Sequence, residues 1–444
     1  MISRRQLLQS STLGFGYLAF SGLAAKAGPL SPKKPHHEPK AKRVIFLCME
    51  GAPSHVDTFD YKPDLIRGGG KSFSGGSLLS PVAEFQQQGE SGLWMSEHFP
   101  KLGQHADEMC IINGMHTDLP AHAQAFVKMH TGNSQFVRPS FGSWALYGLG
   151  TENENLPGFI TLSPPGKNGG SQNYASSFLP AIYQATPIGN SGRLIENAEV
   201  SNLANTVKSG KAQRLQLDLL QKMNRSQLQR ELVNPKIDGL IESYELAFRM
   251  QTEMPDVIDL SDESQATLDL YGIDGGVTDD FGRQCLLARK FAESGVRFIE
   301  LTSPNWDHHT QLSTLLPEKC REIDTPIAGL IADLKQRDML KDTLIIWGGE
   351  FGRTPYAQGA DGRDHNNKAY SVWMAGGGVK GGMNYGVSDD VGYEAVQDPM
   401  DIHDLHATVL HLLGLDHESL TYRYAGRDFR LTDVYGNVPK AILA

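Results

Sequence analysis

An apolar stretch that ends abruptly in polar side chains constrains this chain more than any other feature. Residues 44–49 are apolar throughout and begin with two β-branched residues, which is typical of a strand buried on both faces of a mostly parallel sheet. Glu50 and Gly51 follow directly, and Ser54 and Asp57 come soon after. Open α/β sheets bind ligands outside the carboxyl ends of their strands. We therefore expect chemistry at this strand end, although a strand followed by an ordinary polar loop is the alternative for this stretch alone.

Helices alternate with strands in much of the remaining chain. Apolar runs at 109–112, 296–301 and 343–347 predict three more strands, and residues with helical spacing precede the last two. A further strand is expected at 371–375. This alternation predicts a layered α/β/α domain with a mostly parallel central sheet.

Four of the predicted strands are followed by carboxylate or imidazole groups. Because the carboxyl ends of parallel strands share one edge of a sheet, these side chains could meet there. They are Glu50, Asp57, His122, Asp307, His309, Glu350 and His365. A mixture of imidazole and carboxylate suits Zn²⁺, Mn²⁺ or Fe better than Mg²⁺ or Ca²⁺, which prefer oxygen ligands. The set predicts a site for a divalent metal, Zn or Mn, or for an oxyanion, whereas each short motif alone could be a capped turn.

Two further side chains are candidates for acting on a substrate. His122 begins a predicted helix over 122–131, where exposed N–H groups and the helix dipole favour an anion. Arg353 lies close to Glu350 in the sequence and could hold an anionic substrate. The alternatives are a surface histidine and a surface salt bridge.

The first 27 residues are expected to be a targeting segment. Arg4 and Arg5 precede a mildly apolar stretch and a small-residue cleavage pattern that ends at Ala27, which indicates a twin-arginine signal peptide, with an uncleaved anchor as the alternative. Residues 28–42, rich in Pro, Lys and His, are expected to be a linker, and 43–444 a single domain. The expected location is the periplasm or cell surface, with no stable membrane span after cleavage.

Charge and cysteine content exclude some classes of protein. A net charge of −10 over 444 residues, without a basic stripe in the domain, argues against nucleic-acid binding. The four cysteines are far apart in the sequence and are expected to be buried free thiols, not a disulfide framework or a cysteine zinc site. The oligomeric state is left open.

Two helical regions carry more specific expectations. Residues 201–275 are polar and predict a helical insertion, in which Leu215, Leu219 and Met223 recur every fourth position and are expected to pack on the periphery of the domain. A helix is also predicted over 401–414. Its histidines are expected on the polar or flanking surface and not as ligands.

Several of these motifs together resemble a known family. They are the run from Met49 to Asp60, residues 306–309, 349–355 and 362–366, and the segment 404–436. Almost end to end after the signal, the chain resembles the bacterial domain-of-unknown-function (DUF) 1501 family, which is placed among sulfatase-like and alkaline-phosphatase-like proteins. The resemblance implies an alkaline-phosphatase-like fold with a two-metal phosphatase or sulfatase site. It names no reaction for this chain.

The resemblance also suggests roles for single residues. Asp307 and His309 resemble the Asp and His of one metal site, and His365 resembles a late histidine ligand. Glu50 stands where an Asp-Gly step is expected, and Glu350 where an Asp-His pair is expected. The chain departs from the wider pattern at three points: Phe351 replaces the second member of that pair, His122 occupies the usual nucleophile position, and the Cys/Ser-x-Pro-x-Arg sulfatase signature is absent. A formylglycine-dependent reaction is therefore not expected.

The leading hypothesis is an exported, metal-dependent hydrolase of a phosphate or sulfate ester, on a small molecule or a glycan. One metal would be held by Asp307, His309 and His365, and a second by Glu50, Asp57 or Glu350. His122 or Ser54 would be the nucleophile or acid/base, and Arg353 would hold the oxyanion. The alternative is a non-catalytic binding or assembly protein that keeps the fold.

Overall fold

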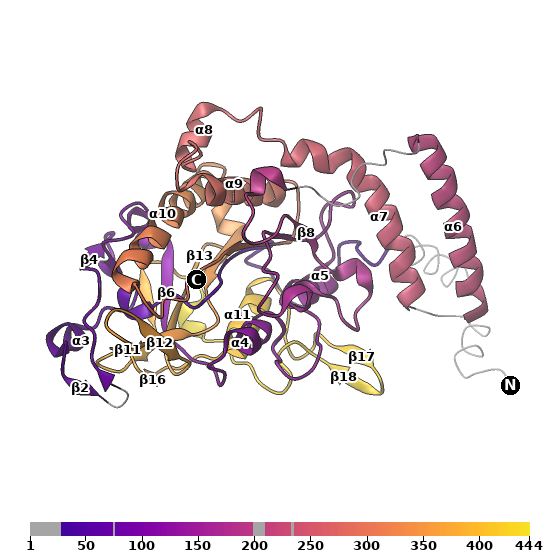
Figure 1. The fold of residues 1–444 in the computed structure, drawn as a ribbon. Coiled ribbons are helices and arrows are strands. Elements are labelled where there is room, and N and C mark those ends of the chain that lie inside the picture. Colours follow the sequence, from indigo (N-terminus) through magenta and orange to yellow (C-terminus); the bar gives the residue numbers. More distant parts are fainter. Residues whose placement is uncertain (1–27, 74–75, 199–208, 232–234) are drawn as a thin grey trace.

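A sheet of eight strands forms the centre of the molecule (Figure 1). The computed structural model describes residues 28–73, 76–198, 209–231 and 235–444, so the predicted signal peptide, 1–27, lies outside the described residues. The strand order is β14-β6-β13-β10-β1-β9-β7-β8. In chain order the strands are β1 (Arg43–Met49), β6 (Met109–Met115), β7 (Phe159–Leu162), β8 (Thr186–Ile188), β9 (Phe298–Ser303), β10 (Thr343–Gly348), β13 (Tyr370–Ala375) and β14 (Met383–Tyr385).

The sheet is mostly parallel, as the helix–strand alternation predicts. β1 lies between β10 and β9 and runs parallel to both, and β7 runs parallel to β9 and β8. β13 is antiparallel to β10 and to β6, so β6 has the same direction as β10. The residues that follow β1, β6, β9 and β10 therefore share one edge of the sheet. Because β13 runs the opposite way, the segment that leads into β13 lies at this edge too.

Helices cover both faces of the sheet and complete the predicted α/β/α layers (Figure 1). α9 and α10 pack against each other on one side, while α4, α5 and α11 lie on the other. The helices are α3 (Pro63–Gly68), α4 (His122–Thr131), α5 (Phe141–Leu149), α6 (Gly210–Glu231), α7 (Pro235–Ile258), α8 (Gln265–Leu270), α9 (Asp279–Glu293), α10 (Leu312–Gln336) and α11 (Ile402–Leu412). All four cysteines are buried free thiols, as expected.

Small two-stranded sheets decorate the ends of the central sheet. They pair β2 (Ser72–Phe73) with β3 (Gly76–Ser77), β4 (Phe85–Gln88) with β5 (Leu93–Ser96), β11 (Gly352–Ala357) with β12 (Arg363–Asn366), β15 (Val387–Ser388) with β16 (Ala395–Gln397), and β17 (Tyr422–Tyr424) with β18 (Arg427–Phe429). The β11–β12 pair follows β10 directly and positions residues at the sheet edge.

The segment 28–42, which is expected to be a linker, lies packed on the domain. Leu30 and Ala41 are buried. The backbone N–H of Lys33 donates to the Leu149 carbonyl at the end of α5, and that of Lys40 donates to the Leu412 carbonyl at the end of α11. These N–H groups satisfy carbonyls at helix ends, which have no partner within their own helix.

The predicted helical insertion is present as α6, α7 and α8, but its apolar stripe is exposed. Leu215, Leu219 and Met223 on α6 are all exposed. The expectation that they pack on the domain is wrong, because α6 contacts α7 through its other face, where Leu217 and Gln221 are buried. Among the described helices, none combines the length and apolar character needed to cross a bilayer.

The predicted C-terminal helix is α11, capped by Asp401, whose side chain accepts hydrogen bonds from the N–H groups of His403 and Asp404. The expectation that its histidines lie on the polar surface is wrong for His403 and His406, which are buried. Their Nε2 atoms lie 2.9 and 2.8 Å from the carbonyls of Gly132 and Met129 at the end of α4. Each Nε2–H donates to a helix-terminal carbonyl, so the two histidines join α11 to α4.

A buried ion pair holds the polar turn after β1 against β12. The side chains of Asp57 and Arg363 are fully buried, with Asp57 Oδ2 2.7 Å from Arg363 Nε and Oδ1 3.1 Å from Nη2. Burial by itself would raise the pKa of Asp57, but the Arg363 guanidinium outweighs it and lowers the pKa below its usual value. The Ser54 hydroxyl and the Val82 N–H also donate to this carboxylate.

We expect Asp57→Asn to lower the free energy of unfolding by about 3–5 kcal/mol, because Arg363 would keep a buried charge without its counter-ion. The wild-type pair contributes stability above the ordinary carboxyl pKa of about 3.9 and loses it as the pH falls through the lower pKa of the folded state. Denaturant unfolding at a series of pH values from about 3 to 7 measures both effects. The double variant Asp57→Asn, Arg363→Met should recover part of the loss, and a single variant as stable as wild type would contradict the assignment.

Candidate metal centre

The ends of β1 and β9 are joined at the sheet edge. The Glu50 N–H donates to the Ser303 carbonyl at 2.9 Å, and the Trp306 N–H donates to the Glu50 carbonyl at 3.1 Å. These two hydrogen bonds fix the position of the backbone just before Asp307. The start of α4 brings His122 to the same place, and the β11–β12 pair brings His365.

Three imidazoles converge on one carboxylate oxygen, that of Asp307. Within the described part of the chain, one ligand atom each from His122, Asp307, His309 and His365 lies within 4.8 Å of the others. Asp307 Oδ1 is 2.9 Å from His309 Nε2, 3.2 Å from His122 Nε2 and 3.6 Å from His365 Nε2. We call these four residues the Asp307 cluster. Three imidazoles and one carboxylate are a ligand set that transition metals accept.

The tautomers in the cluster leave lone pairs facing one another. His365 Nδ1 is 2.7 Å from the Pro120 carbonyl, and His309 Nδ1 faces Gln358 Oε1, so each neutral ring carries its proton on Nδ1. Their Nε2 atoms are then both acceptors, yet they lie 3.0 Å apart. Two lone pairs at this distance repel unless a proton or a cation lies between them. The residues therefore fit a bound cation.

His122 has the same arrangement with a carboxylate behind it. Its Nδ1 is 2.5 Å from Glu350 Oε1, and Glu350 also accepts the Gly51 N–H at 3.2 Å. Glu350 is fully buried and holds the His122 proton on Nδ1. His122 Nε2 is buried without hydrogen-bond geometry to any partner in the described chain, although Asp307 Oδ1 is close. Once it has lost its proton, this nitrogen can ligate a metal or attack a substrate.

The electrostatics of the cluster favour positive charge. Burial by itself would lower the pKa of His122, but the neighbouring carboxylates of Asp307 and Glu350 outweigh it and raise the pKa to about 9, so a metal bound at Nε2 would take the place of a proton. Burial alone would also raise the pKa of Asp307, whereas the neighbouring imidazoles of His122 and His365 and the charge of Arg353 lower it well below its usual range. For Glu50, burial raises the pKa, and the nearby Glu350 adds to the rise. Several carboxylates gathered in one place are typical of a site that binds a cation.

The backbone at the end of β1 has an unusual conformation. Gly51 has φ of +112°, and a Cβ there would lie 2.7 Å from the Asp307 nitrogen and 2.9 Å from the Trp306 nitrogen. Ala52 follows with φ of +63°, which costs energy in a residue with a side chain. The turn is held in this form by the contact between strand ends, and a glycine at 51 lets the Asp307 backbone approach.

Arg353 holds the Asp307 carboxylate and the turn after β1 in place. Its guanidinium is buried and donates to the carbonyls of Gly51 and Ala52 and to Asp307 Oδ1, the last at 2.6 Å. It was predicted to hold an oxyanion. In the structure its donors are directed at the β1 turn and at Asp307, so it orients the carboxylate on which the histidines converge.

A cavity of about 410 Å³ lies beside the Asp307 cluster. Glu50, His122 and Asp307 line it together with residues of the loop after β7. Lys167 supplies a cation to its wall, and the Asn168 side chain donates to Glu50 Oε1 at 2.8 Å. The sequence indicated a loop-rich region near the site but did not single out Lys167 or Asn168. A lysine in a Gly/Pro/Asn-rich loop has no local pattern that marks it.

The structure brings most of the predicted site residues together, but not all of them. Glu50, His122, Asp307, His309, Glu350 and His365 meet at the sheet edge. Asp57 and Ser54 are instead committed to the buried pair with Arg363, and neither lines the cavity. His308 is buried, and burial, with the charge of Arg353, lowers its pKa to about 4, so it remains a neutral ring outside the cluster.

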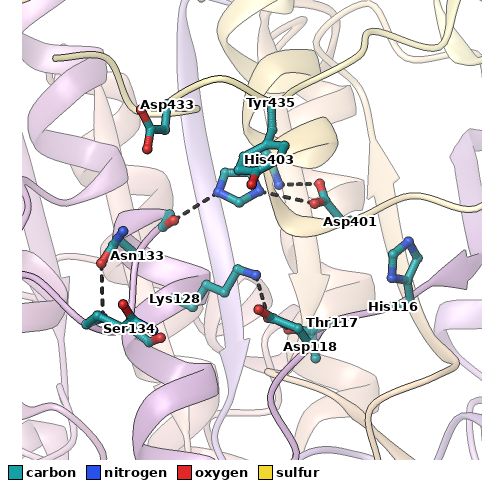
Figure 2. A pocket seen from close by; sticks show the side chains of 12 residues that line it. His116, Thr117, Asp118, Lys128, Asn133, Ser134, Asp401, His403, Asp433 and Tyr435 are labelled. Atoms are coloured by element: carbon teal, nitrogen blue, oxygen red, sulfur yellow. Dashed lines mark hydrogen bonds and ion pairs between the residues drawn. The ribbon is translucent and has the colours of Figure 1, made fainter. Parts of the chain in front are cut away.

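A second cavity, of about 490 Å³, lies near the other end of α4 (Figure 2). In Figure 2, Lys128 reaches Asp118, and His403 lies between Asp401 and a carbonyl of the chain. The Tyr435 ring lies 5.0 Å from that of His403. Among the described residues, the Asp307 cluster is the group in which three or more ligand atoms of this kind converge, so the second cavity is the weaker candidate for a cation.

We expect the purified protein to contain a stoichiometric transition metal that Asp307→Ala and His365→Ala both remove. Asp307 is the anion that all three imidazoles approach, and His365 supplies one of the facing Nε2 atoms. Inductively coupled plasma mass spectrometry measures the metal, and circular dichroism checks the fold. His116→Ala, at a half-buried histidine of the second cavity, is the matched control and should retain the metal. Unchanged metal in both variants would place it elsewhere.

Comparisons with known proteins place the chain in a family without a described reaction. No curated protein matches the sequence. Among solved structures, the PsFucS1 sulfatase from Pseudoalteromonas sp. is similar with a TM-score of 0.40 and 14% identity, over 90% of this chain and 70% of that one. The alkaline phosphatase from the Antarctic bacterium TAB5 has a TM-score of 0.37 and 11% identity, over 85% and 99%. The lipoteichoic acid synthase LtaP from Listeria monocytogenes has a TM-score of 0.37 and 10% identity, over 90% and 78%. The model of the protein family of unknown function DUF1501 matches residues 41–443, and the chain therefore belongs to that family.

Proposed function

We propose that this protein is an exported, metal-dependent hydrolase of a phosphate or sulfate ester. The observation that carries the proposal is the Asp307 cluster, whose Nε2 atoms converge beside a cavity with a lysine in its wall. The substrate would be a small molecule or a glycan that carries the ester. Export by the twin-arginine pathway to the periplasm or cell surface is part of the proposal and rests on the sequence of residues 1–27.

Asp307, His309 and His365 would hold the metal, Zn or Mn. When bound, a divalent metal supplies a Lewis acid for the ester oxygen and lowers the pKa of a bound water to about 7. Gln358 and the Pro120 carbonyl fix the rings of His309 and His365 through their Nδ1–H groups. Such partners behind the ligands set both tautomer and ring orientation. Arg353 performs the same task for Asp307.

His122 would act as the nucleophile or as the acid/base. It lines the cavity, whereas His309 and His365 do not. Glu350 accepts its Nδ1–H and leaves the Nε2 lone pair toward the cluster, which is how a carboxylate prepares a catalytic imidazole. His122 is the first residue of α4, so the N–H groups at the start of that helix would lie next to the anionic ester group of the substrate.

Lys167 would bind the anionic part of the substrate. It is the cation in the cavity wall, and Asn168 and Asn305 add amide groups next to it. Arg353, by contrast, already directs its donors to the chain. A phosphate or sulfate group held by Lys167 would lie between this lysine and His122.

Replacing His122 with alanine should lower kcat/KM for p-nitrophenyl phosphate or p-nitrophenyl sulfate by about 10²- to 10⁴-fold while the fold and metal remain. The reason is that His122 is the imidazole of the cluster that lines the cavity, with its Nδ1 held by Glu350. His116→Ala is again the control and should keep full activity. If His122→Ala loses the metal as well, His122 is a ligand and not the nucleophile.

Replacing Lys167 with alanine should raise KM about 10- to 100-fold with a smaller effect on kcat, because a charge-assisted hydrogen bond to the substrate is lost. Lys167→Arg should recover part of the affinity, and Lys71→Ala, at an exposed lysine outside the cavity, should have no effect. Steady-state kinetics at constant ionic strength separate the two constants. A folded, metal-loaded wild type that hydrolyses neither class of ester would contradict the hydrolase and favour the binding protein.

A further inference from the structure

Helix α6 carries an apolar stripe that no other part of the described chain covers. Leu215, Leu219 and Met223 are 64%, 61% and 61% exposed, and Leu220 beside them is 38% exposed. The first three recur every four residues, so they form one line of about 12 Å along the helix. Single exposed apolar residues are ordinary, whereas four on one helix face mark an interaction surface.

Basic side chains border this stripe. Lys211 and Lys222 lie next to Leu215 and Leu219 on the helical wheel, and Arg225 lies beyond them. All three are exposed, and none has an ion-pair partner among the described residues. Asp218 is the acidic residue of α6 up to position 226, and Arg214 binds it. The face is therefore positive, although the whole chain carries a net charge of −10.

Contacts with α7 determine which face of α6 is exposed. Arg214 pairs with Glu245 at 2.8 Å, and the Gln221 side chain donates to the Ile241 carbonyl at 2.7 Å. Leu217 and Gln221 are buried on that side. α7 separates α6 from the central sheet, and α6 lies at the margin of the molecule (Figure 1). The stripe can thus meet a flat surface without any rearrangement of the domain.

We propose that α6 docks the protein on a membrane surface of anionic lipid. Leucine and methionine would enter the boundary between headgroups and acyl chains, and the lysines would reach back to the lipid phosphates. Each basic residue near an anionic surface adds to the attraction, and the acidic remainder of the chain is repelled from it. The charge pattern therefore selects both the surface and the orientation of the protein on it.

A second copy of the chain fits the same face less well. A stable interface between proteins uses about 20 to 30 residues from each partner, and the stripe offers four apolar ones. A symmetric dimer through this face would also bring together two copies of a surface with a net positive charge. Like charges at close range disfavour that arrangement.

The test is co-sedimentation of the full chain with vesicles of phosphatidylcholine, with and without phosphatidylglycerol. We expect binding to the anionic vesicles at least about 10-fold stronger than to pure phosphatidylcholine, with a decrease at high salt. Leu215→Gln with Leu219→Gln should reduce it about 10-fold or more, and so should Lys211→Glu with Lys222→Glu. Val277→Gln with Val434→Gln removes two exposed apolar residues elsewhere and should leave it unchanged. Every variant retains residues 1–27, so the comparison isolates α6.

Three results would overturn the proposal. The first is no binding of the wild type to either kind of vesicle. The second is binding to anionic vesicles that the leucine and lysine variants do not reduce, in folded protein as judged by circular dichroism. The third is a dimer by light scattering that the leucine variant dissociates without any change in vesicle binding, which would assign the stripe to a second copy.

Discussion

The site depends on the convergence of four hydrogen-bond acceptors that have no proton donor between them. Asp307 Oδ1 and three imidazole Nε2 atoms approach one another, yet the Nδ1 atoms of those imidazoles already face oxygen acceptors. A set of acceptors that converges in this way is unstable by itself, and a cation is the simplest way to satisfy it. Arg353 supplies one positive charge from below, which lowers the pKa of Asp307 but leaves the imidazole lone pairs unmatched.

Much of the surrounding structure keeps these groups in place. The β1 and β9 ends are crossed by backbone hydrogen bonds, and Gly51 at φ of +112° permits the close approach of Asp307. The Asp57–Arg363 pair fixes the turn after β1 against β12, the strand that carries His365. Two arginines thus act below the site as structural cations. The donors of both arginines are directed at the chain itself, whereas Lys167 lines the cavity.

The sequence was sufficient to predict where the site lies, but not which partner each of its side chains has. Strand ends followed by Glu50, Asp307 and Glu350 pointed to one sheet edge, and the parallel order of β1, β9 and β10 puts them there. Asp57 and Ser54 come from the same motif, but a turn directs them into the interior, where Arg363 neutralises Asp57. Arg363 lies 306 positions away in the sequence, so no local pattern could show the pair. For the same reason Lys167 and Asn168 were not singled out.

The sequence by itself determined the elements and the chemistry available at their ends, since burial of apolar runs and helical spacing are local properties. It was sufficient for the α/β layers, for α4 beginning at His122 and for the α11 cap at Asp401. The tertiary structure decided direction and partners. It turned β13 antiparallel, which brings His365 to the site, and it buried His403 and His406 against the end of α4. It also left the α6 stripe exposed. These outcomes depend on which surfaces, distant in the sequence, come into contact. Hydrophobic periodicity shows that one face of a helix is apolar, but it does not show which part of the chain will cover that face.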